Sequence, residues 1–73
     1  MEYEDKRGWR FEVRPGLHYK TYWTIHCYNP KKNLWWPWPC ASWYGTKKEA
    51  EKVLKRYAKE RGWQEIEQKI GGK

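Results

Sequence analysis

The sequence of 73 residues has few of the side chains that carry most enzyme chemistry. It contains one Ser, one Asp, two His and two Cys. A nucleophile, a base and an orienting carboxylate cannot be assembled from so few groups, and three of the eight glutamates fall where a helix surface is predicted. We therefore expect no catalytic residue and no enzymatic activity.

Metal ligands are equally scarce. The soft ligands are His18, His26, Cys27 and Cys40, whereas a structural zinc site usually has two close pairs of ligands. His26 and Cys27 are adjacent, and adjacent side chains on a strand point to opposite faces. We expect no metal, no other cofactor, and two buried cysteines that form no disulfide.

Long apolar runs are also missing. No run approaches the roughly 20 residues of a membrane-spanning helix, and the N-terminal residues MEYEDKRGW are charged where a secretory signal would be hydrophobic. Two free cysteines fit a reducing compartment. These observations predict a cytoplasmic protein that has no membrane partner.

Aromatic and basic residues dominate what is present. The chain has seven Trp, six Tyr and one Phe but only eight Leu, Ile and Val in total, and its net charge is +7. Disordered chains are poor in aromatics, and 73 residues suffice for one small domain. We predict a single folded domain over residues 9–70, with a flexible N-terminus at residues 1–8 and a tail at 71–73.

Alternation of apolar and polar residues predicts three strands. The first begins at Trp9 and ends before the Pro15-Gly16 turn, and the second covers about 19–28. A turn at 29–33 leads into the third, over 34–39. The two prolines of this third segment lack N–H donors, so it must be an edge strand or leave the sheet early.

A helix is predicted over Lys47–Arg61. Thr46 and Glu49 have the spacing of a capping box, and Gly62 fits a left-handed C-terminal cap. One apolar stripe follows the helical period: Ala50, Val53, Leu54, Tyr57 and Ala58.

These elements predict an α+β domain in which a three-stranded antiparallel sheet packs on one C-terminal α-helix. Ile66 and Ile70 allow a short fourth strand after the helix. The expected contacts join Ala50, Val53, Leu54 and Tyr57 of the helix to Trp9, Phe11, Trp23 and Ile25 of the sheet.

Two segments carry a family resemblance, Trp9-Arg10-Phe11-Glu12-Val13 and Thr46-Lys47-Lys48-Glu49-Ala50. With this order of elements, the chain resembles the DNA-binding domain at the N-termini of tyrosine integrases. The resemblance implies that the exposed sheet face enters the DNA major groove. Small phage and bacterial families of unknown function are similar in layout, and the phage-type likeness predicts a viral protein.

Cations and aromatic rings on the outward sheet face point to a nucleic-acid partner, DNA rather than RNA. Cations meet phosphates, and planar rings stack on bases or reach base edges. The candidate binding residues on this face and at the following turn are Arg10, Arg14, Lys20, Tyr22, His26, Tyr28, Lys31 and Lys32. If nucleic acid contacts the helix instead of the sheet, Lys52, Lys55 and Lys59 are the expected contacts. Alternatively, the cations only solubilise the domain, and the seven cations and three Glu of residues 47–61 form an ordinary solvated face.

The Trp-Pro segment supports a second function. An exposed aromatic patch marks a binding surface on a monomer, and Trp is enriched at protein–protein hot spots. The domain would then be a small phage-type protein-binding module, or an inhibitor of a host or defence enzyme with an acidic surface. Alternatively, Trp36 and Trp38 point into the core. The candidate patch consists of Trp35, Trp36, Trp38 and Trp43.

Overall fold

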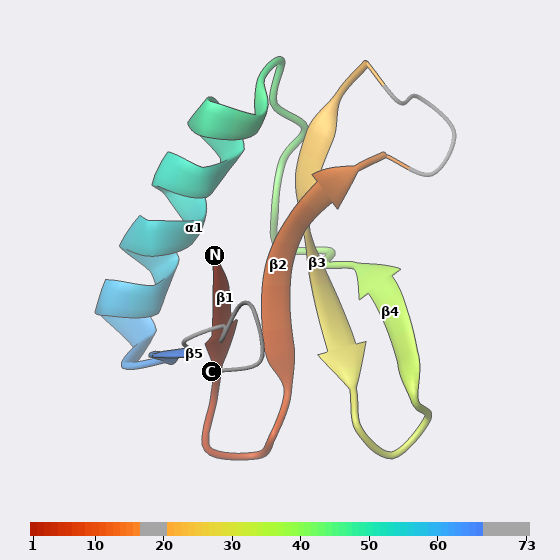
Figure 1. The fold of residues 1–73 in the computed structure, drawn as a ribbon, viewed down its shortest axis with the longest axis vertical. Coiled ribbons are helices and arrows are strands. Elements are labelled where there is room, and N and C mark those ends of the chain that lie inside the picture. The colour runs from red at the N-terminus through yellow and green to blue at the C-terminus, as the bar shows by residue number, and fades with distance from the viewer. Residues whose placement is uncertain (17–20, 67–73) are drawn as a thin grey trace, which may run out of the picture.

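The computed structural model describes residues 1–16 and 21–66, which form an α+β fold with one antiparallel sheet (Figure 1). The fold class is therefore confirmed, but the described sheet has five strands in the order β4-β3-β2-β1-β5, not three or four. The elements in chain order are β1 (Glu2–Glu4), β2 (Arg10–Pro15), β3 (Trp23–Asn29), β4 (Leu34–Pro37), α1 (Lys47–Arg61) and β5 (Gln64–Ile66).

Strand β1 lies within residues 1–8, where a flexible N-terminus was expected, and β5 includes Ile66 of the short fourth strand that the sequence allowed. Tyr3 pairs with Phe11 on one side and with Glu65 on the other, so β1 lies inside the sheet. The turn that follows β1 is fixed by Asp5, whose carboxylate accepts hydrogen bonds from the backbone N–H groups of Arg7 and Trp9. Long-range pairing thus orders a segment with a single apolar side chain between two glutamates.

Strands β2, β3 and β4 form the predicted antiparallel meander. Phe11 pairs with Cys27, which pairs with Trp36, and this row faces the helix side of the sheet. β4 is an edge strand in the described chain and ends at Pro37, as the missing proline N–H groups require. The chain then leaves the sheet and returns to it at an isolated bridge between Tyr44 and Trp23.

The helix spans its predicted range because its caps work as expected. The Thr46 hydroxyl accepts a 3.1 Å hydrogen bond from the Glu49 N–H. Gly62 has a φ of 75°, a left-handed conformation that favours glycine, and its N–H bonds the Ala58 carbonyl. Figure 1 shows α1 along one side of the sheet, with β4 at the side away from it.

The core lies between α1 and strands β2 and β3. Of the eight expected contact residues, Phe11, Ile25, Ala50 and Leu54 are buried. The rest pack around this centre as a partly buried rim: Trp9, Trp23, Val53 and Tyr57.

Two further tryptophans complete the core. Trp63 stacks on Phe11 with ring centroids 3.8 Å apart. Trp38 meets Phe11 and Tyr57 edge to face, at 5.5 and 5.0 Å between ring centroids. Large rings thus close a core whose centre is Phe and aliphatic residues.

The cysteines differ from each other, contrary to the expectation that both are buried. Both are free thiols, but Cys27 is buried in β3 and Cys40 is exposed after β4. Burial raises the pKa of the Cys27 thiol. Cys40 is exposed because the chain leaves the sheet at Pro37.

Candidate nucleic-acid interface

The sheet face away from α1 carries a row of cations and rings. Arg10, Tyr28 and Trp35 are register partners across three strands, and the pair Arg14 and Thr24 lies on the same face of the sheet. The Arg14 guanidinium lies 4.0 Å from the centroid of Trp35, whose ring is 5.3 Å from that of Tyr28. The sequence therefore predicted correctly that Arg10, Arg14 and Tyr28 share a face.

Glutamates neutralise this row. Arg14 lies 3.2 Å from a carboxylate oxygen of Glu12, and Arg10 lies 3.8 Å from one of Glu2. Glu4 pairs in register with Arg10 on the same face. The arginines of this face are thus engaged by carboxylates and rings, which reduces the positive potential available to phosphates.

His26 is buried with a relative exposure of 2 %, so the structure contradicts its assignment as a surface contact. In register it stands between Glu12 of β2 and Pro37 of β4, and its Nδ1 donates to the Thr24 carbonyl at 3.4 Å. Desolvation lowers the pKa of His26, an effect that the Thr24 hydrogen bond opposes and the Arg14 charge reinforces. At neutral pH the imidazole is therefore uncharged.

The other predicted contacts are dispersed. Lys31 and Lys32 are exposed on the β3–β4 turn, and Tyr22 is exposed before β3. The Tyr28 hydroxyl donates to the side-chain oxygen of Asn33. Lys20 lies outside the described residues.

The four tryptophans of the candidate aromatic patch do not share one surface. Trp35 lies under Arg14 on the face away from α1, whereas Trp36 is on the opposite face and exposed. Trp38 packs in the core rim, and Trp43 is exposed on the segment after β4. Of the pair expected to point inward, only Trp38 does so.

The cations of α1 form a continuous surface. At about 100° per residue around the helix axis, five of them fall within an arc of about 100°, opposite buried Ala50, Leu54 and Ala58. All are exposed, and none has an ion pair or cation–π contact within the described residues. We name this surface the cation stripe: Lys48, Lys52, Lys55, Arg56 and Lys59.

The glutamates of α1 lie beside the cation stripe, not within it. On the same helical wheel, Glu49 and Glu60 fall on one flank and Glu51 on the other. The remaining helix cations are directed elsewhere, because Lys47 lies over the Trp23 ring and Arg61 over the Trp38 ring. The surface of α1 is therefore segregated by charge.

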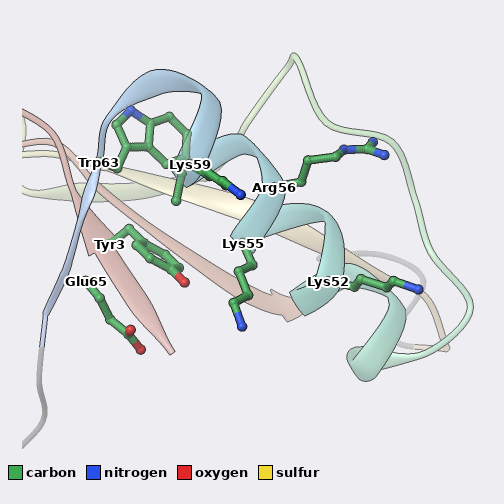
Figure 2. A pocket seen from close by; sticks show the side chains of 8 residues that line it. Tyr3, Lys52, Lys55, Arg56, Lys59, Trp63 and Glu65 are labelled. Atoms are coloured by element: carbon green, nitrogen blue, oxygen red, sulfur yellow. The ribbon is translucent and has the colours of Figure 1, made fainter.

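A groove of about 530 Å³ runs between the cation stripe and the sheet edge (Figure 2). Its sheet side is formed by Tyr3 and Glu65, and Trp63 closes one end. Burial, and next the Glu65 charge, raise the pKa of the Tyr3 hydroxyl, which therefore stays protonated and can donate a hydrogen bond. Lys55 and Lys59 line the helix side of the same groove.

Lys52, Lys55 and Lys59 were predicted as an alternative contact on the helix, but the arc that they share with Lys48 and Arg56 was not defined. Their arc can be calculated once Ala50, Leu54 and Ala58 define the buried side, so this signal was present in the sequence. The contribution of Tyr3 to the groove could not be found, because β1 depends on pairing with β2 and β5.

Two structural features are absent from the described residues. Across 1–16 and 21–66, no three His, Cys, Asp or Glu side chains gather closely enough to hold a metal ion. No helix in these ranges has the length and apolar character that crossing a bilayer requires.

No known protein-family model, no curated protein and no solved structure matches the chain. The resemblance to the integrase domain therefore stays a prediction from two short segments, and function must be inferred from the surface itself.

Proposed function

We propose that this protein binds nucleic acid, DNA in particular, without catalysing a reaction, and that the cation stripe contacts the phosphates. The supporting observation is the crowding of unpaired like charges. Lys52 lies one turn from both Lys48 and Arg56, and Lys55 lies one turn from Lys59. Each such pair destabilises an isolated helix by about 0.2–0.5 kcal/mol, and an anionic ligand removes this repulsion.

The dimensions of the cation stripe fit a duplex. Lys48 and Lys59 are separated by about 16 Å along the helix axis. The major groove of B-DNA is about 12 Å wide. Cations at the two ends can therefore reach phosphates on both strands while α1 lies against the groove.

The composition of the cation stripe supports binding that is independent of sequence. Four of its five members are Lys, which contacts phosphates as a point charge. It contains no Asn or Gln to read adenine, and Arg56 is its one side chain with the rigid planar fork that suits a bidentate contact to guanine. The stripe therefore positions the protein on the backbone and reads little from the bases.

Two double variants with the same charge change test this assignment. Lys52→Gln with Lys59→Gln removes two cations of the stripe, while Lys31→Gln with Lys32→Gln removes two from the β3–β4 turn. Binding of a labelled random-sequence duplex is followed by fluorescence anisotropy at several salt concentrations. We expect the stripe variant to weaken binding and to lower the slope of log K against log salt by about 1.8.

The turn variant serves as the matched control and should retain the wild-type slope. The integrase resemblance makes a different prediction, namely that Arg10→Gln and Arg14→Gln weaken binding while the stripe variant does not. That result would place the contact on the sheet. Failure of the wild-type protein to bind duplex, single-stranded DNA or RNA at low salt would overturn the proposed function.

A further inference from the structure

A second groove lies where the helix side of the sheet is not covered by α1. Its volume is about 410 Å³, and its walls come from strands β3 and β4, the turn between them, Trp9 just before β2 and the segment after β4. Trp36 and Leu34 of β4 are 57 % and 50 % exposed, because α1 packs on β2 and β3. The side chains that make its walls apolar are Trp9, Cys27, Leu34, Trp36 and Pro39.

Adjacent exposed apolar residues are unfavourable on a monomer unless another molecule covers them. Leu34 and Trp36 are two residues apart on one strand, so their side chains lie on the same face. Trp43 has a similar exposure of 52 % but does not line this groove. The groove is therefore an apolar surface formed by several side chains, whereas Trp43 is a single exposed ring.

Cations lie on the turns at one end of this groove. Lys32 lines it, and Lys31 precedes Lys32 on the β3–β4 turn. A Cβ at Gly8 would lie 3.8 Å from Pro30, so the β1–β2 turn, which carries Lys6, adjoins the β3–β4 turn. None of these three lysines has an ion pair within the described residues, and the nearby Asp5 carboxylate is bound by Arg7 at 2.8 Å.

From this juxtaposition we infer that the groove binds an acidic, extended segment of another protein. An apolar side chain of the segment fills the space between Trp9, Leu34 and Trp36, and its carboxylates lie against Lys31 and Lys32. β4 is an edge strand in the described chain, so an extended segment can also pair with its backbone, up to Pro37.

Other occupants fit the groove less well. A second copy of the chain would bring the same lysines and a net charge of +7. A nucleic-acid strand needs a row of flat stacking surfaces, whereas the described lining includes Leu34 and Pro39, which are not planar. None of the groove residues belongs to the cation stripe, so the two surfaces can be tested separately.

A random peptide library displayed on phage tests this directly, with immobilised full-length protein as the target. The expected peptides combine Asp or Glu with an aromatic residue or Leu. The affinities of the enriched peptides are then measured with Trp36→Ala and, as a matched control, Trp43→Ala. Both tryptophans are about half exposed, so both variants should melt like the wild type.

We expect Trp36→Ala to weaken the enriched peptides at least about tenfold, as for other hot-spot tryptophans, and Trp43→Ala to leave them unchanged. Lys31→Gln with Lys32→Gln should also weaken them, and Lys52→Gln with Lys59→Gln should not. The inference would be overturned if the library yields no enriched peptides, or if the enriched peptides bind Trp36→Ala as tightly as the wild type. The inference would also be overturned if a single-stranded oligonucleotide displaces the peptides and its own binding is weakened by Trp36→Ala.

Discussion

Lys52→Glu should stabilise the free protein while it weakens DNA binding. Lys52 is exposed and has like charges one turn away on both sides, at Lys48 and Arg56. Glutamate turns the repulsion from Lys48, Lys55 and Arg56 into attraction, and it turns the attraction to Glu49 into repulsion. The balance is two pairs reversed in sign, and each reversal is worth about 0.4–1 kcal/mol, twice the value of one pair. The net gain is about 1 kcal/mol, because Lys and Glu have similar helix propensities. For a domain of this size, that gain raises Tm by about 4–8 °C.

The same substitution places a negative charge in the middle of the cation stripe. It removes one phosphate contact, which lowers the salt slope for a duplex by about 0.9, and it adds repulsion toward neighbouring phosphates. We therefore expect duplex affinity to fall by at least about tenfold at low salt, since charge effects of this kind are strongest there. A rise in Tm together with a fall in duplex affinity indicates a binding surface, because cations that only solubilise the protein would not affect DNA binding.

Thermal melting followed by circular dichroism and anisotropy with a labelled duplex measure the two effects. Lys32→Glu is the control, because it makes the same charge change on the β3–β4 turn, away from α1. Lys32→Glu should change both Tm and the duplex affinity much less than Lys52→Glu does. A Lys52→Glu protein that melts at or below the wild-type temperature, or binds DNA equally well, would refute the reasoning.

Three other predictions concern the core and the buried titratable groups. Leu54→Ala should cost about 2–5 kcal/mol in urea unfolding, because the side chain is fully buried, and unchanged unfolding would contradict the packing. Burial lowers the pKa of His26, so the unfolded chain binds its proton first. Stability should therefore fall as the pH drops below about 6.5, an effect that His26→Gln should abolish if urea unfolding is compared across pH. In the native protein, iodoacetamide should alkylate Cys40 and not Cys27, and equal modification by mass spectrometry would show that Cys27 is accessible.

Local signals determined how much of the fold could be predicted. The helix bounds followed from Thr46 and Gly62, because capping needs only neighbouring residues. The strands of the meander followed from alternation, which reports burial on one face. β1 could not be predicted, since Tyr3 is one apolar residue between two glutamates and gains its order from pairing with β2 and β5.

The candidate interface was harder to predict for the same reason. Alternation placed Arg10 and Arg14 correctly on the outward face, but the partner of Arg10 is Glu2 of the unpredicted β1. The burial of His26 likewise depends on tertiary neighbours, since alternation assigns a face and not an exposure. The cation stripe needs only the helical period and the buried side, so it is the part of the surface most accessible to sequence reasoning.

An amide NMR titration of the isotope-labelled protein with a random-sequence DNA duplex tests the central claim most directly. We expect the largest chemical-shift changes on α1, around Lys48, Lys52 and Lys59, and we expect added salt to reverse them. Changes concentrated on β2 and β3, around Arg14 and Tyr28, would instead assign binding to the sheet face. A spectrum that does not change with duplex at low salt would contradict DNA binding altogether.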